Sequence, residues 1–191
     1  MVSIHQFLSV VLAASLALSL ALASTPASAK KKKKHQQPVE QQQPPEDSPD
    51  VIFAKSLVGK AYDDGLTVEG WDEVDGGLVA PPVYVRRYQR EDGTYLVLTS
   101  RELKKATKTE PASYVIADAL IVPKLQADMQ FSIACVLGKD QTLNFMGEAK
   151  GKEDKEWWTD VRRAWQISLE TGEIASVPPK GIRCTNASWG Q

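Results

Sequence analysis

The sequence predicts a β-rich α+β fold: a single domain built on one antiparallel sheet of about six strands, with one or two short helices. Apolar and polar residues alternate over several short segments, which is typical of half-buried strands. Turns that contain Gly, one of them an Asp-Gly pair, separate these segments. Runs with helical spacing are few and short. Together these three features predict an antiparallel sheet with one or two short helices.

The segment Gln130–Lys150 shows the strand pattern best. It contains two runs with a period of two, joined by a connection that contains Gly138. The side chains expected on its apolar face are Phe131, Ile133, Cys135 and Leu137 in the first run, and Leu143, Phe145 and Ala149 in the second. This segment is therefore the expected core hairpin.

Other strand-like runs flank this hairpin in the sequence. The run Tyr114–Val122 is apolar on both faces apart from Asp118, which is typical of a central strand. Asp118 is interpreted as structural, either paired with a basic neighbour or facing water at an edge. The remaining predicted strands form two hairpins: Val83–Arg90 with Thr94–Ser100, and Trp165–Leu169 with Glu173–Val177. A final segment, Gly181–Gln191, is expected to be held in place by Cys184.

The predicted helices rest on weaker patterns. Thr99 and Glu102 have capping-box spacing, which predicts a short helix over Arg101–Lys108. Asp154 is placed to cap a second helix over Glu153–Arg163, although the same residues also fit a strand.

The start of the domain has less regular patterns. The segment Val51–Tyr62 is expected to be a short helix or an irregular lead-in, because Gly59 disfavours a long helix. The segment Asp63–Pro82 is rich in Gly and Asp and is expected to form turns and short edge strands.

The first 29 residues have the features of a secretory signal peptide. An uncharged apolar run, Phe7–Ala23, precedes a small-residue site that ends at Ala29, where cleavage is expected. The alternative is a membrane anchor that stays uncleaved. It is suggested by the absence of Lys and Arg before the run and by the five lysines Lys30–Lys34 after it. We expect export to the periplasm or the medium.

Residues 30–50 contain Lys, Gln, Pro and Glu and almost no apolar side chains, so they are expected to form a disordered linker. Contact of Lys30–Lys34 with an anionic membrane surface is an alternative to a plain spacer. The globular domain is expected over residues 51–191. It carries eighteen basic and twenty acidic residues, which argues against nucleic-acid binding.

The chain has two cysteines, Cys135 and Cys184, which lie 49 positions apart. In an exported chain this predicts a disulfide, because oxidising compartments favour the bond. The alternative is a pair of buried free thiols. A redox-active C-x-x-C pair is excluded by the spacing.

The lack of histidine in the predicted domain excludes several kinds of active site and metal site. His5 and His35 are the only two, and both precede the predicted domain. A Ser-His-Asp or Cys-His nucleophile therefore has no base there, and imidazole-based zinc or copper sites have no ligands. We expect no catalytic residue, no metal and no cofactor.

Carboxylates are the remaining catalytic candidates. The Asp63–Asp75 loop is rich in them, and two carboxylates about 5–9 Å apart suffice for glycoside hydrolysis. Acidic residues beside Gly are also ordinary turn residues, and the loop lacks the pattern of a calcium site. A histidine-free glycan hydrolase is therefore the alternative function rather than the leading one.

The leading candidate for a binding site is one face of the predicted strand 83–90. At a period of two, this face carries Tyr84, Arg86, Tyr88 and Arg90. Rings and guanidinium groups in alternation stack on ligands and pair with anions. The other interpretation is an ordinary solvated sheet face. We therefore expect an exported, non-enzymatic domain that binds a partner protein or an anionic envelope polymer.

Overall fold

The computed structural model describes residues 43–63 and 65–190. The predicted signal peptide and most of the predicted linker lie outside the described residues. Within the described ranges, no helix is long and apolar enough to cross a membrane. The described part is β-rich, as predicted, and has one short helix and two antiparallel sheets.

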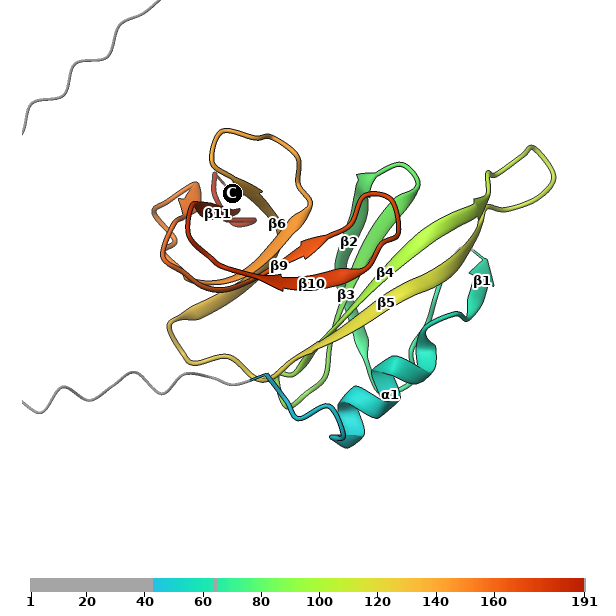
Figure 1. Cartoon of the computed structure of the whole chain (residues 1–191), viewed down its shortest axis with the longest axis horizontal. Helices are drawn as coiled ribbons and strands as arrows, with labels where there is room; N and C mark the ends of the chain where they lie inside the picture. Colours follow the sequence, from blue (N-terminus) through green and yellow to red (C-terminus); the bar gives the residue numbers. More distant parts are fainter. Residues whose placement is uncertain (1–42, 64, 191) are drawn as a thin grey trace, which may run out of the picture. The chain divides into compact units, whose positions relative to one another are not determined.

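Within the described residues, helix α1 comes first and eleven strands follow it. Figure 1 shows their arrangement. The elements are α1 Pro49–Leu57, β1 Ala61–Asp63, β2 Asp72–Ala80, β3 Val83–Gln89, β4 Tyr95–Lys104, β5 Ser113–Val122, β6 Met129–Leu137, β7 Phe145–Lys150, β8 Trp157–Trp158, β9 Val161–Ile167, β10 Ile174–Val177 and β11 Ile182–Thr185.

The prediction of one sheet is wrong, because the strands divide between two. The order in the five-stranded sheet is β1-β5-β4-β3-β2, and in the six-stranded sheet it is β10-β9-β7-β6-β11-β8. Apolar side chains from both sheets meet in one core, which includes Val85 and Val97 from the first and Met146 and Trp165 from the second. A single sheet could not bury this many apolar side chains on one face, whereas two stacked sheets can.

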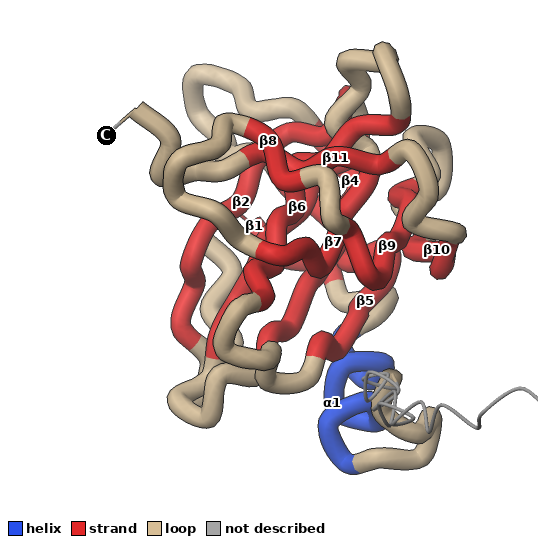
Figure 2. The backbone as a smooth tube through the Cα atoms, turned by 90° about the vertical axis from the view of Figure 1, so that its left-hand side faces the viewer, coloured by secondary structure: helices blue, strands red, loops and turns tan. Residues whose placement is uncertain are grey.

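The other face of the five-stranded sheet packs against α1. The helix lies next to β5 (Figure 2). Ala54 of α1 is 1% exposed and lies with Leu96, Leu98 and Ile116 in a second core. The helix begins inside the predicted linker, because Ser48 caps it: the Ser48 Oγ accepts from the N–H of Val51 at 3.4 Å. Of the two possibilities for Val51–Tyr62, the helix is the one that the structure shows over most of the segment.

Both helices predicted further along the chain are wrong. The segment Arg101–Lys108 instead continues strand β4 to Lys104, which pairs with β3 and β5. The segment Glu153–Arg163 contains β8 and the start of β9. In both cases pairing with neighbouring strands overrides the local capping pattern, because each added residue gains ladder hydrogen bonds and a side-chain contact.

The hairpin over Gln130–Lys150 is confirmed as β6 and β7. The predicted alternation fails beyond Ser132, because the register shifts between Ser132 and Cys135. Such a bulge reverses which residues face the core. As a result Val136 is fully buried while Leu137 is 44% exposed.

The predicted disulfide is confirmed. Cys135 of β6 and Cys184 of β11 are opposite each other in the ladder and are joined at an S–S distance of 2.03 Å. Both cysteines are fully buried in a third cluster with Phe145, Ala164 and Ile182. The bond therefore fastens the C-terminal segment to the core hairpin, as the cysteine spacing led us to expect.

Candidate functional site

Three tyrosines gather on the α1-side face of the five-stranded sheet. They are Tyr62 on β1, Tyr84 on β3 and Tyr114 on β5, and all three are partly exposed. The ladder places Tyr62 directly opposite Tyr114. We call these three side chains the tyrosine cluster.

The rings of the cluster contact one another. The centroids of Tyr62 and Tyr114 lie 5.4 Å apart in a stacked arrangement, and those of Tyr84 and Tyr114 lie 5.2 Å apart, edge to face. Such ring pairs contribute about 0.5–1.5 kcal/mol beyond the area they bury. The hydroxyl of Tyr62 donates to the Ser100 Oγ at 2.9 Å. The cluster is thus a held surface of aromatic rings rather than a set of free side chains.

Arg86 of β3 lies next to this cluster on the same face. Its Nη1 donates to the Glu73 Oε1 at 2.8 Å, and its side chain is 25% exposed. Partial burial disfavours the charged guanidinium, but the nearby carboxylate of Glu73 outweighs this and the pKa of Arg86 is raised. Arg86 therefore stays charged and is held in position by its partner.

A shallow hollow of about 180 Å³ opens between β2 and β3 beside Tyr84. It is lined by Glu73, Gly76, Gly77, Tyr84, Val85 and Arg86. The two glycines have no side chains to fill the space. A larger hollow of about 280 Å³ lies between the segment before α1, α1 itself and β5. It is lined without any aromatic ring, so it offers a ligand fewer specific contacts.

The four residues predicted as a binding face divide into two pairs. Tyr84 and Arg86 lie at the hollow, as just described. Tyr88 is only 1% exposed, and its hydroxyl donates to the Leu66 carbonyl at 3.0 Å. Burial, and then the negative charge of Glu73, raise the pKa of Tyr88 to about 12. Tyr88 is part of the core under α1.

Arg90 also supports structure. Its guanidinium donates to both carboxylate oxygens of Asp50 on α1, at 2.9 and 3.1 Å, and to Asp92 in the turn after β3. These hydrogen bonds raise the pKa of Arg90 and lower that of Asp92. The group also lies 5.0 Å from the ring centroid of Trp71. Arg90 thus ties α1 and the segment before β2 to the end of the sheet. A binding role for the four predicted residues as a set stays a prediction.

Tyr62 and Tyr114 were not among the predicted site residues. They come from distant parts of the sequence and meet only because β1 pairs with β5. No local motif links them. The only signal in the sequence is the position of Tyr114 near the start of the apolar run of β5. That position does not distinguish a surface tyrosine from a core residue.

Two carboxylates of the Asp63–Asp75 loop are paired with arginines. Glu73 pairs with Arg86, while both oxygens of Asp75 accept from Arg87, at 2.9 and 2.6 Å. Arg86 and Arg87 are neighbours on β3 and point to opposite faces of the sheet. A register shift between Glu73 and Asp75 lets each carboxylate reach its own arginine.

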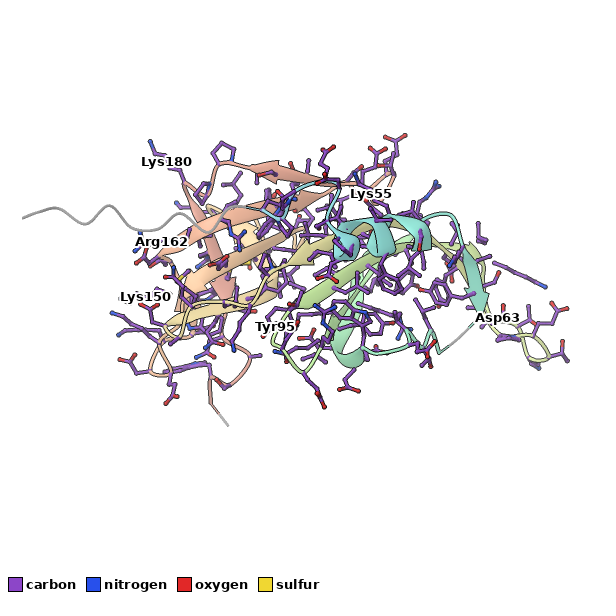
Figure 3. The ribbon with its side chains drawn as sticks, turned by 90° about the horizontal axis from the view of Figure 1, so that it is seen from below. Lys55, Asp63, Tyr95, Lys150, Arg162 and Lys180 are labelled. Carbon is purple, nitrogen blue, oxygen red and sulfur yellow. A yellow bond between two sulfur atoms is a disulfide. The ribbon has the colours of Figure 1, made fainter. Side chains whose placement is uncertain are left out.

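The first residues of that loop lie elsewhere. Asp63 is at the end of β1, at the opposite end of the domain from Lys150, Arg162 and Lys180 (Figure 3). Asp64 lies outside the described residues. Among the described residues, no group of three or more His, Cys, Asp or Glu side chains is placed to hold a metal ion.

The carboxylate of Asp118 accepts hydrogen bonds from the protein backbone. Its two carboxylate oxygens accept from the backbone N–H groups of Ala119 at 2.8 Å and of Ile174 at 2.7 Å. The structural interpretation is supported, although the partners are backbone amides and not the expected basic side chain. Because Ile174 is in β10, the carboxylate links the two sheets.

Comparison of the chain with protein-family models, curated proteins and solved structures gives no match. The geometry of the tyrosine cluster and of the neighbouring hollow is therefore what a functional assignment has to start from.

Proposed function

We propose that the domain is a non-enzymatic binding module of an exported protein, and that it binds a partner protein through the tyrosine cluster and Arg86. The observation that carries the proposal is the concentration of three partly exposed, mutually packed tyrosines beside an arginine and a hollow. Tyr and Arg are among the residues that most often dominate the free energy of protein–protein binding. Rings that are already held in place lose little conformational entropy when a partner covers them.

An anionic envelope polymer is less well supported as the ligand. Arg86 is already paired with Glu73, and the tyrosine side chains supply no cationic group. The surface therefore offers contact area and hydroxyl groups rather than excess positive charge. A histidine-free glycan hydrolase is also less well supported, because Glu73 and Asp75 are each paired with an arginine on opposite sides of the sheet.

Crosslinking in the native cell envelope, followed by capture of the domain, tests the proposal. We expect a discrete partner protein, and we expect Tyr84→Ala or Tyr114→Ala to lower its affinity by about tenfold or more, the effect of losing an aromatic hot spot. Trp189→Ala is the matched control, because Trp189 is a 50% exposed aromatic residue outside the cluster. Equal loss in all three variants would contradict a role for the cluster. Glycan cleavage that Asp72→Asn and Asp75→Asn abolish would instead support the hydrolase.

Export is part of the same proposal, and the disulfide supports it, since such bonds persist in oxidising compartments. The intact mass of the protein from its native cell tests this directly. We expect a chain that begins at Lys30 and weighs two hydrogens less than its reduced form. A mass that includes the first 29 residues, or free thiols in the native protein, would contradict it.

A further inference from the structure

Strand β2 has the longest open edge among the strands that the structure describes. The two sheets end in four edge strands, and three of them are short: β1 has three residues, β10 has four and β8 has two. Strand β2 has nine. Long open edges attract other strands, so proteins usually shorten or block them.

The hydrogen bonds of the sheet show which groups of β2 point outward. The N–H of Arg90 donates to the Thr94 carbonyl and the N–H of Glu102 donates to the Pro82 carbonyl, which sets the alternation between β3 and β4. By this alternation Val85 and Arg87 direct their backbone groups toward β2.

The partners of Val85 and Arg87 in the ladder are Gly77 and Asp75. The residues between and after these two, Gly76 and Leu78, therefore direct their N–H and C=O groups away from the sheet. No backbone group in residues 43–63 or 65–190 is hydrogen-bonded to β2 apart from the ladder with β3.

Two common means of blocking an edge are absent from β2. It contains no Lys, and no Pro interrupts it between Asp72 and Ala80. Two apolar side chains are open to solvent, Val74 at 46% and Leu78 at 52% exposed. Irregularities after Glu73 and after Leu78 confine the regular part to Asp75–Leu78, which is long enough for a short strand to pair.

The two halves of the β2 edge differ in charge. Its first half carries Asp72, Glu73 and Asp75, and its second half is Leu78, Val79 and Ala80. An antiparallel pairing of two copies centred on Gly76, whose backbone groups face outward, would place Glu73 and Asp72 of each copy against Val79 and Ala80 of the other. That arrangement opposes charge with an apolar side chain, so a second copy fits poorly.

We propose that β2 takes up an extended segment of a partner protein as an additional antiparallel strand. The segment is apolar where it begins, beside Leu78, and basic where it ends, beside Asp72. Gly76 and Gly77 line the hollow together with Tyr84 and Arg86, so a partner side chain opposite these glycines lies beside it. Backbone hydrogen bonds then supply much of the affinity, and the hollow and the acidic end supply specificity. The inference rests on the proposed binding function and names the form of the partner.

The probe for a first test is a random heptapeptide library displayed on phage, with the oxidised domain as bait. We expect selected peptides with β-branched or aromatic residues at the start and Lys or Arg at the end. In amide hydrogen exchange, a selected peptide should slow the exchange of Gly76 and Leu78. The amide of Gly77, which already bonds to β3, is the internal control. Unchanged exchange at Gly76 and Leu78, or selection of no peptide, would overturn the proposal.

Two substitutions of Leu78 distinguish the contribution of its backbone N–H to binding from that of its side chain. Leu78→Pro removes an outward N–H without breaking the ladder, since Pro is tolerated on an edge strand where its nitrogen faces solvent. Leu78→Ala keeps that N–H. We expect Leu78→Pro to weaken peptide binding at least tenfold and Leu78→Ala to weaken it less.

Equal binding by both variants would overturn strand addition. If Tyr84→Ala still abolished capture of the partner in that case, the proposed function would stand without it. The domain could also form a dimer that the substitution Leu78→Pro dissociates. That result would show that a second copy pairs with the β2 edge, and it would overturn the proposal.

Discussion

Removing the disulfide between Cys135 and Cys184 should be the most destabilising change of covalent structure in this domain. The two residues are 49 positions apart, and in the chain-entropy model a closed loop of this length constrains the unfolded chain by about 4 kcal/mol. Small domains are stable by only about 5–15 kcal/mol. Cys135→Ala/Cys184→Ala should therefore lose a large share of the free energy of unfolding.

The packing around the disulfide allows a sharper test through Gly147. A Cβ atom at Gly147 would lie 2.7 Å from the Cys184 Sγ and 3.2 Å from Val161 Cγ1. The first distance is a clash, so Gly147→Ala should cost about 1–3 kcal/mol, the usual cost of overfilling a packed core. Without the two sulfur atoms much of the clash disappears. The cost of Gly147→Ala should then be clearly smaller.

Urea unfolding of the wild type, each variant and their combination gives the coupling free energy as a double-mutant cycle. We expect the combined variant to be more stable than the sum of the separate effects predicts. Strict additivity, or a loss well under 1 kcal/mol on removal of the disulfide, would refute the reasoning.

Two further predictions concern buried polar groups. Because the pKa of Tyr88 is raised from 10 to about 12 in the fold, its contribution to stability is complete below pH 10 and is lost as the pH rises toward 12. Unfolding curves and tyrosinate absorbance over this interval should show the loss, and Tyr88→Phe should remove it; an unchanged pH dependence would contradict the assignment. Asn186, in an N-glycosylation sequon, is 6% exposed and donates to the carbonyls of Lys152, Glu153 and Lys155. Asn186→Ala should cost about 1 kcal/mol or more by removing these hydrogen bonds, and a glycan on Asn186 in the folded protein, detected by mass, would show that this environment opens.

Local chemistry determined several features that the sequence alone predicts correctly. The turn Glu91-Asp92-Gly93 joins two alternating runs, and β3 and β4 form there, because such a turn needs only its own residues and their nearest neighbours. The disulfide was predicted from the presence of two cysteines in a chain with the features of a signal peptide. The β-rich class follows from the alternation itself, since a period of two suits few structures other than a strand.

Tertiary contacts decided what local chemistry left open. Thr99 has the side chain of a helix cap, but its hydroxyl donates to the Gly172 carbonyl at 2.6 Å and its backbone lies in β4. A capping interaction is worth about 1 kcal/mol, and ladder bonds on both sides of a strand exceed it.

In the candidate site, too, local sequence determined some features and tertiary contacts determined others. The alternation along 83–90 correctly indicates one face of a strand, but it carries no information about what covers that face. The helix α1 and the segment before β2 bury Tyr88 and engage Arg90, whereas the pairing of β1 with β5 brings Tyr62 and Tyr114 to Tyr84. Periodicity is a property of neighbours in the chain. Burial and the meeting of distant side chains depend on how the sheets and the helix pack, so only the tertiary structure assigns them.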